Sequence, residues 1–120
     1  MKGLIIKPYW ADLILSGQKT WEIRGQNTNH RGHTEIIYSG TGHIYGSAEL
    51  VESFRISEAM FEASRDEHQI EPWKFDISRY KEIYAWAFEN PSFHDEPIPY
   101  KHPQGVVIWV NLPDTLGVQS

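Results

Sequence analysis

Residues 3–25 read GLIIKPYWADLILSGQKTWEIRG, and this stretch decides the fold because it predicts a strand, a helix and a second strand in close succession. The apolar run Gly3–Ile6 is typical of a buried strand. Pro8 favours the first turn of a helix, where its missing N–H group would have no partner in any case. Gly17 supplies the left-handed residue that ends such a helix. The alternation over Gln18–Arg24 then predicts a strand with its polar side chains on one face.

The rest of the chain is predicted to be mainly strands separated by turn residues. A strand over His43–Phe54 contains Gly46, which indicates a bulge. Ser57 favours the start of a short helix, and residues 65–80 are mixed and acidic. The run Gly105–Leu112 is apolar on both faces, so we expect a central strand there. The other expected strands are Thr34–Tyr38 and Ile83–Phe88. The pattern predicts an α+β fold of about six strands and two or three short helices, as a small twisted sheet or partly closed barrel.

Length and composition exclude several classes of protein. The chain has 120 residues, the size of one domain, and its 40% apolar and 22% charged residues exclude a disordered chain. The absence of cysteine excludes a disulfide scaffold, a thiol nucleophile and a thiolate metal site. No apolar run is long enough to span a membrane and the N-terminus does not resemble a secretory signal. We therefore expect a cytoplasmic protein with one domain over residues 1–112 and a loose tail over residues 113–120.

The charge of the chain is unevenly distributed. The net charge of −5 argues against a protein that coats nucleic acid by bulk electrostatics. Residues 1–34, however, carry five bases against two acids, while residues 48–96 carry twelve acids against five bases. A partner with phosphate groups would therefore have to meet the N-terminal third of the chain. A chance imbalance between segments is the alternative explanation.

The densest polar cluster follows the Gly17 turn. On a strand, Glu22 and Arg24 share one face, and Lys19 lies where the preceding turn can redirect it. Two cations and an acid at one helix–strand corner are able to position a phosphate or a carbonyl group, with Glu22 moving protons and Arg24 acting as a bidentate clamp. The alternative is a solvated strand face whose Glu–Arg pair contributes little energy.

Two further features suit a binding site. Trp10 lies near the polar corner, and an aromatic ring beside basic groups is able to stack on a nucleobase, although most aromatic residues in such patterns belong to the core. The loop over residues 98–105 places Tyr100, Lys101, His102 and Gln104 between prolines, which is typical of either a rigid binding lip or a rigid surface connection. Six histidines, with His30 and His33 three residues apart, could form a His/carboxylate metal site. None of the usual helical metal-ligand spacings appears with a catalytic acid between, so we expect no metal ion and no cofactor.

These residues together resemble the ASCH domain, a branch of the PUA-like superfamily. The resemblance begins with the apolar strand, the helix ending in Gly17, and then Lys19, Thr20, Glu22 and Arg24. It continues through the stretches at residues 31–32 (RG), 39–51 (SGTGHIYGSAELV), 67–68 (EH), 84–91 (YAWAFENP) and 99–112 (PYKHPQGVVIWVNL). It covers about residues 3–112, and the combination is more specific than the Lys19–Arg24 pattern by itself.

The resemblance implies a PUA-like six-stranded mixed β-barrel with flanking helices and a cleft beside Lys19. The implied partner is RNA or a modified nucleoside. Some members of the family resemble RNA-binding modules or weak ribonucleases, and others resemble amidohydrolases that remove acetyl from N(4)-acetylcytidine. The expected catalytic residues are Lys19, Glu22 and Glu67. The expected ligand-binding residues are Trp10, Thr20, Arg24, Arg31, Ser39, His68, Tyr100, Lys101, His102 and Gln104.

The sequence departs from the amidohydrolase branch at one position. That branch uses a lysine, a threonine three residues later and a glutamate near the middle helix. Lys19 matches the lysine, but Glu22 stands at the threonine position, and either Glu67 or Glu71 is a candidate for the middle acid. Three hypotheses follow: an RNA- or nucleotide-binding domain with slow hydrolysis, an acetylcytidine amidohydrolase, and a non-enzymatic partner-binding module. The last would need an exposed apolar patch, for which the candidates are Phe54, Phe61 and Phe93.

Overall fold

The first 25 residues form the strand–helix–strand unit that their pattern predicts. The computed structural model describes residues 1–74 and 76–114. In it, β1 (Lys2–Ile6) leads into α1 (Pro8–Leu15), which begins at its proline. Gly17 has a φ of +85° and lies just beyond the end of the helix. The strand β2 (Trp21–Arg24) follows and is shorter than the predicted Gln18–Arg24.

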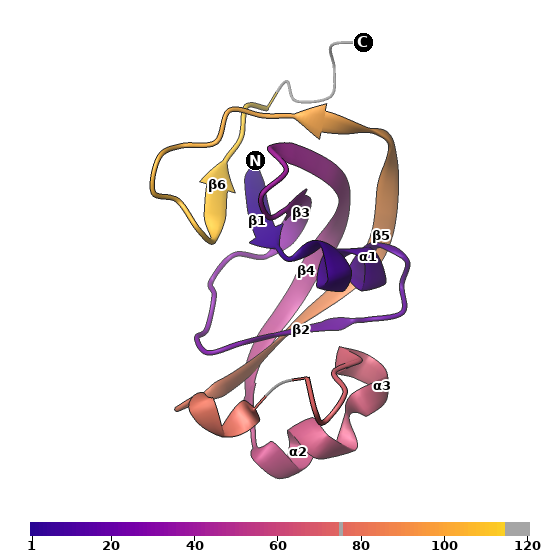
Figure 1. Cartoon of the computed structure of the whole chain (residues 1–120), viewed down its shortest axis with the longest axis vertical. Coiled ribbons are helices and arrows are strands. Elements are labelled where there is room, and N and C mark those ends of the chain that lie inside the picture. Colours follow the sequence, from indigo (N-terminus) through magenta and orange to yellow (C-terminus); the bar gives the residue numbers. More distant parts are fainter. Residues whose placement is uncertain (75, 115–120) are drawn as a thin grey trace.

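The remaining strands complete a mixed six-stranded sheet, as the α+β prediction requires. The order is β2-β5-β4-β3-β1-β6, in which β1 and β3 are parallel and the other neighbours are antiparallel. Figure 1 shows α2 and α3 together at one end of the molecule and β6 towards the other, with β2 crossing between them. The other elements are β3 (Gly32–Tyr38), β4 (His43–Ile56), α2 (Glu58–Ala63), α3 (Arg65–His68), the 3-10 helix η1 (Ile77–Arg79), β5 (Ile83–Pro99) and β6 (Trp109–Asn111).

Gly46 lies at the predicted bulge in β4. The pairing of β4 with β5 shifts in register between Ile44 and Gly46. A Cβ atom on Gly46 would collide with the carbonyl oxygen of Ser92 and lie 2.8 Å from the Leu15 side chain. The missing side chain therefore lets β5 approach β4 at the point where the end of α1 packs on the sheet.

The prediction of a central strand over Gly105–Leu112 is wrong. Only Trp109–Asn111 forms a strand, and β6 is the last strand of the sheet, paired with β1 alone. The run is apolar on both faces for another reason: Val110 belongs to one buried cluster, while Trp109 packs against a different one. The sheet curves, so both faces of β6 pack against apolar side chains although β6 is a strand at the end of the sheet.

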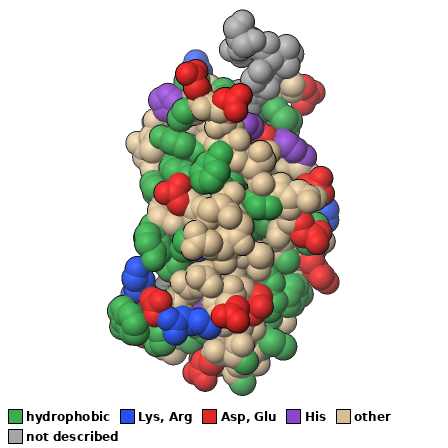
Figure 2. Space-filling view, turned by 90° about the vertical axis from the view of Figure 1, so that its right-hand side faces the viewer, with side chains coloured by type: hydrophobic (Ala, Val, Ile, Leu, Met, Phe, Trp, Pro, Cys, Tyr) green, Lys and Arg blue, Asp and Glu red, His purple; other side chains and the backbone are tan. Residues whose placement is uncertain are grey.

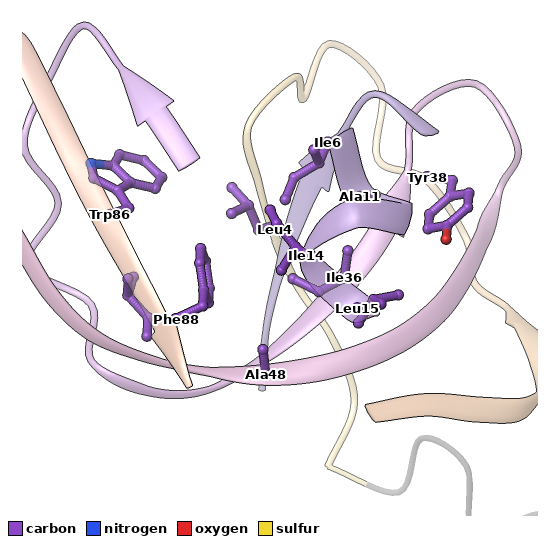
Figure 3. Close-up of a cluster of buried hydrophobic side chains, with 11 residues drawn as sticks. Leu4, Ile6, Ala11, Ile14, Leu15, Ile36, Tyr38, Ala48, Trp86 and Phe88 are labelled. Atoms are coloured by element: carbon purple, nitrogen blue, oxygen red, sulfur yellow. The ribbon is translucent and has the colours of Figure 1, made fainter. Parts of the chain in front are cut away.

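The main core lies between α1 and the curved sheet. Figure 3 shows Ala11, Ile14 and Leu15 of α1 facing Leu4 of β1 and Ile36 of β3. All five side chains are at most 3% exposed. This packing holds the C-terminal half of α1 on the sheet, and therefore holds the turn that carries Lys19.

The two ends of the sheet approach each other through side chains. The Arg24 guanidinium on β2 donates a hydrogen bond of 3.0 Å to the carbonyl oxygen of Ile5 on β1. Trp86 on β5 stacks on Trp109 on β6, with ring centroids 5.7 Å apart. Among the described residues, β2 and β6 do not pair with each other, so the sheet stays open. Side chains, rather than backbone hydrogen bonds, bridge its two ends. Within the described ranges, no helix has the length and apolar character to cross a membrane.

Candidate functional site

A pocket of about 390 Å³ opens beside Lys19, where β1, α1 and β2 converge. A further side is lined by residues between α3 and β5, namely Ile70, Lys74 and Tyr80. Ser39, which follows β3, also lines the pocket. Its lining is Ile5, Lys7, Trp10, Lys19, Glu22, Ile23, Arg24, Ser39, Ile70, Lys74, Tyr80 and Val107. We call this space the central pocket. It joins residues from most of the chain around the polar corner that the sequence singles out.

Lys19 is a buried amine at the base of the central pocket. Its residue is 1% exposed, and its Nζ donates a hydrogen bond of 2.6 Å to the carbonyl oxygen of His68. The Trp10 ring centroid lies 4.8 Å from the same nitrogen. Burial lowers the pKa of Lys19 to about 8, although the nearby carboxylate of Glu22 acts in the opposite direction. The amine is therefore mostly protonated at pH 7, and its unprotonated fraction grows as the pH approaches 8.

Backbone hydrogen bonds of the turn hold Lys19 in this position. The Gly17 N–H donates to the carbonyl of Ile14, and the Lys19 N–H donates to the carbonyl of Leu13. Both bonds satisfy carbonyl groups that the end of α1 would otherwise leave unpaired. The helix end therefore directs the side chain that follows it into the pocket.

Glu22 and Arg24 form a preorganised pair on one face of β2. Arg24 Nε donates a 3.1 Å hydrogen bond to Glu22 Oε2, and Glu22 Oε1 lies 3.7 Å from Lys19 Nζ. Glu22 is 7% exposed, while the Arg24 guanidinium also lies over the Trp86 ring at 5.3 Å from its centroid. The structure thus brings the predicted acid and both predicted cations together. Removing any one of them leaves a neighbouring charge short of its partner.

Trp10 and a further lysine, Lys74, line the side of the pocket next to α1, with Tyr9 packed beside them. Tyr9 and Trp10 meet edge to face with centroids 4.8 Å apart. Lys74 Nζ lies 4.1 Å from the Tyr9 centroid and 6.0 Å from that of Trp10. Such contacts favour a cation over an aromatic face. This side of the pocket therefore combines an aromatic surface with positive charge.

The structure gives His68 a structural position. Its residue is 1% exposed; Nδ1 accepts a hydrogen bond from the N–H of Ile70, which requires Nε2 to carry the proton that it donates to the carbonyl of Phe61. Burial lowers the pKa of His68, consistent with this neutral ring. His68 does not line the central pocket, but its carbonyl oxygen holds Lys19 there.

Glu67 and Thr20 are linked through their backbones. The Thr20 N–H donates a 2.9 Å hydrogen bond to the Glu67 carbonyl, and neither side chain lines the central pocket. Thr20 is exposed and faces a separate hollow near Phe88. Among the described residues lining the central pocket, Glu22 supplies the only carboxylate.

Part of the loop before β6 reaches a second hollow of about 370 Å³. Tyr100 and His102 line it together with Ser39, and we call it the Tyr100 hollow. Lys101 and Gln104 are exposed and line neither space. Arg31 is also exposed, and its guanidinium donates to the carbonyls of two neighbours in its own loop, Thr28 and His30.

Several pocket residues were not predicted from the sequence. Lys74, Tyr80 and Ile70 come from the mixed segment that showed no periodicity, and Lys7 and Val107 lie outside the helices and strands. A tryptophan beside a lysine at residues 73–74 was the available signal for this side of the site. Of the three phenylalanines proposed as an exposed patch, Phe61 is buried, Phe54 is partly buried and Phe93 is 49% exposed.

No group of three or more His, Asp or Glu side chains is arranged to hold a metal ion within residues 1–74 and 76–114. The nearest arrangement is on the sheet, where both Glu35 carboxylate oxygens are engaged. His94 Nε2 lies 2.7 Å from one oxygen, and His33 hydrogen-bonds the other. This carboxylate links β3 to the far half of β5.

Acidic side chains are spread over the face shown in Figure 2, with fewer Lys and Arg among them. This distribution agrees with the net charge of −5. The central pocket differs from that surface, because Lys7, Lys19, Arg24 and Lys74 line it against the single carboxylate of Glu22. Positive charge is thus local to the pocket.

Comparisons with known proteins agree with this architecture. The family model described as "ASCH domain" matches residues 4–97. The solved structure of the ASCH protein from Zymomonas mobilis superposes with a TM-score of 0.73 at 16% identity, covering 94% of this chain and 87% of that one. Two single-substitution mutants of that protein give the same TM-score and identity, with 90% and 88% of their chains covered.

No curated protein sequence matches the chain significantly. The structural likeness, at 16% identity, supports the fold. The family model covers well over half of the sequence and includes β1, α1 and β2, which build the central pocket. The chain therefore belongs to the ASCH domain family.

Proposed function

We propose that the central pocket binds one nucleotide unit of single-stranded RNA. The observation that carries this proposal is the combination of the Trp10 ring with Lys19 and Arg24 in one pocket of about 390 Å³. An aromatic face stacks on a nucleobase and basic side chains contact phosphate, which is how proteins hold single-stranded nucleic acid. The volume lies within the range of small-molecule sites.

Each polar residue has a role in this proposal. Arg24 uses two of its donors on Glu22 and on the Ile5 carbonyl, and a guanidinium carries five, which leaves donors for a phosphate. Lys74 and Lys7 line the pocket as further cations for the backbone of the strand. Glu22 fixes the plane of Arg24 and is an acceptor for a base edge.

A slow ribonuclease activity would use the same groups. Glu22 would take the proton of a ribose 2′-hydroxyl as that oxygen attacks the adjacent phosphorus. Lys19, largely protonated below its pKa of about 8, would give a proton to the departing 5′-oxygen. Both groups line the central pocket. Because the attacking and departing oxygens lie on opposite sides of the phosphorus, the 3.7 Å contact between the two groups would open as the phosphate enters.

Amide hydrolysis of N(4)-acetylcytidine is the second candidate, and the lowered pKa of Lys19 favours it. The neutral amine would accept a proton from water as the water oxygen attacks the acetyl carbonyl carbon. The carbon–nitrogen bond would then break, with the proton passing to N4 and acetate leaving. This route needs the neutral amine, so its rate should rise with pH towards about 8, whereas a ribonuclease with Lys19 as acid should slow there.

RNA binding is tested by titrating a labelled single-stranded RNA at several salt concentrations. We expect the logarithm of affinity to fall linearly with the logarithm of salt, because phosphate contacts release counterions. Lys74→Gln, at an exposed position, should weaken binding and reduce that slope by roughly one. Arg55→Gln is the control, since Arg55 is exposed on β4 and lines none of the spaces described. Affinity that does not depend on salt would contradict the phosphate contacts.

The enzymatic alternatives are separated by following acetate release and RNA cleavage from pH 6 to pH 9. Lys19→Met keeps the length of the buried side chain and removes its amine. Lys81→Met makes the same change at an exposed position. Deacetylation lost only in Lys19→Met supports the amidohydrolase, and RNA cleavage lost only in Lys19→Met supports the ribonuclease. Activity that survives in Lys19→Met would remove Lys19 from either mechanism.

A further inference from the structure

The central pocket continues into neighbouring hollows on two sides. On one side it shares Ile5, Ser39 and Val107 with the Tyr100 hollow. On the other side it shares Lys74 with a hollow of about 580 Å³ that Trp73 and Arg79 also line, which we call the Trp73 hollow. Because neighbouring spaces share side chains, the three hollows adjoin one another with the central pocket in the middle, and we call them together the groove.

The Trp73 hollow combines an exposed aromatic ring with two cations. Trp73 is 78% exposed, the largest exposed fraction among the big apolar side chains of the described chain. Lys74 and Arg79 line the same hollow. Asp76 also lines it, and its carboxylate accepts hydrogen bonds from the N–H of Ser78 at 3.1 Å and from its hydroxyl at 2.5 Å. An indole left in water beside basic groups suits a flat, negatively charged partner.

The Tyr100 hollow presents aromatic rings as well. The Tyr100 hydroxyl lies 2.8 Å from Nδ1 of His102, and the two rings meet edge to face with centroids 5.8 Å apart. The described lining of this hollow contains no Lys, Arg, Asp or Glu. It therefore offers stacking and neutral hydrogen bonding, with the charged contacts placed further along the groove.

The groove is positively charged in an acidic protein. Its lining carries five basic side chains (Lys7, Lys19, Arg24, Lys74 and Arg79) against two carboxylates, Glu22 and Asp76. The chain as a whole has a net charge of −5. Aromatic faces at both ends and cations between them match a strand that alternates bases with a phosphate backbone.

We propose that the three hollows bind a single-stranded oligonucleotide of at least three nucleotides. One base stacks on Trp73, the next nucleotide fills the central pocket, and a third base contacts Tyr100 and His102. This inference rests on the proposed function, since it extends the same site. It also favours a polymer over a free nucleoside as the ligand, because a nucleoside would leave both aromatic ends unused.

The proposal is tested with a length series of oligouridylates, from the mononucleotide to the hexanucleotide, by fluorescence anisotropy competition. We expect affinity to rise with each nucleotide up to about three and to rise little beyond that. Trp73→Ala should weaken trinucleotide binding about 5- to 150-fold, the range found for the loss of one stacked base. His102→Ala should weaken it as well. Both variants should bind the mononucleotide as the wild type does.

Phe93→Ala is the matched control, because Phe93 is an exposed aromatic residue that lines none of the three hollows. Trp73 and His102 are exposed, so their variants should fold, and circular dichroism checks this. Equal affinity for mononucleotide and hexanucleotide, or trinucleotide binding that neither variant changes, would overturn the groove while leaving nucleotide binding in the central pocket intact. Absence of binding at every length would instead contradict the proposed function itself.

Discussion

At the scale of single residues, the buried Lys19 amine makes the stability of the protein depend on pH. Its pKa is about 8 in the folded chain against 10.5 for the free side chain. Between these values the unfolded chain binds more protons, so the free energy of unfolding should rise with pH across the window. The full difference corresponds to on the order of 3 kcal/mol.

Urea unfolding of the wild type and Lys19→Met at pH 7, 8, 9 and 10 measures this effect. The wild type should gain stability relative to the variant as the pH rises. Tyr38, Tyr80 and Tyr100, whose pKa values burial raises, act in the opposite direction at high pH, but they are present in both proteins and cancel in the comparison. Parallel stability profiles would show that the folded chain does not perturb Lys19.

The predictability of the site also differs from residue to residue. Glu22 and Arg24 could be placed together from the sequence, because residues two apart on a strand share a face. Lys74 could not, because it reaches the pocket from a segment without helical or strand periodicity. His68 stood beside an acid and resembled a site residue, yet both ring nitrogens bond backbone groups. A sequence shows that a histidine is present, and only packing shows which partners it meets.

At the scale of elements, the close approach of β4, β5 and α1 depends on Gly46. Gly46→Ala should destabilise the fold by about 1–3 kcal/mol, the cost of inserting a methyl group into a well-packed site. The added carbon meets the backbone oxygen of Ser92, which moves only if β5 moves. Denaturant unfolding measures the loss, and Ser47→Ala on the same strand is the control. If Gly46→Ala unfolded at the same denaturant concentration as the wild type, β5 would be able to move away from the added methyl group at no cost in stability.

The strands differ in how well the sequence predicts them. The start of β1, the start of α1 and the Gly46 bulge follow from local signals that packing does not override. The length of β5 does not, because residues 91–103 contain four prolines and the strand continues to Pro99. Three of them, Pro91, Pro97 and Pro99, lie within β5 and are tolerated because β2 pairs only with Tyr84–Ala87, so the far half of β5 borders β4 alone. Whether a proline ends a strand depends on whether a second strand pairs beside it. That second strand comes from elsewhere in the chain, so the local sequence does not reveal it.

At the scale of the whole molecule, side chains join the two ends of the open sheet around the central pocket. Arg24 connects β2 to β1, and the Trp86–Trp109 stack connects β5 to β6. The same Arg24 lines the pocket and lies over the Trp86 ring. Closure of the sheet and organisation of the site thus share residues, so loosening the sheet should also loosen the site.

A matched pair of tryptophan substitutions tests that link. Trp109→Leu removes a ring that packs against the main core, and we expect it to lower the free energy of unfolding by about 1–2 kcal/mol, since aromatic stacking adds to the area buried. Trp73→Leu makes the same chemical change at a position 78% exposed and should leave stability unchanged. Hydrogen exchange should then accelerate in Trp109→Leu at the Ile5 N–H, which donates to the Ile108 carbonyl beside the pocket. Equal stability of the two variants would show that the Trp86–Trp109 contact does not hold β6 in place.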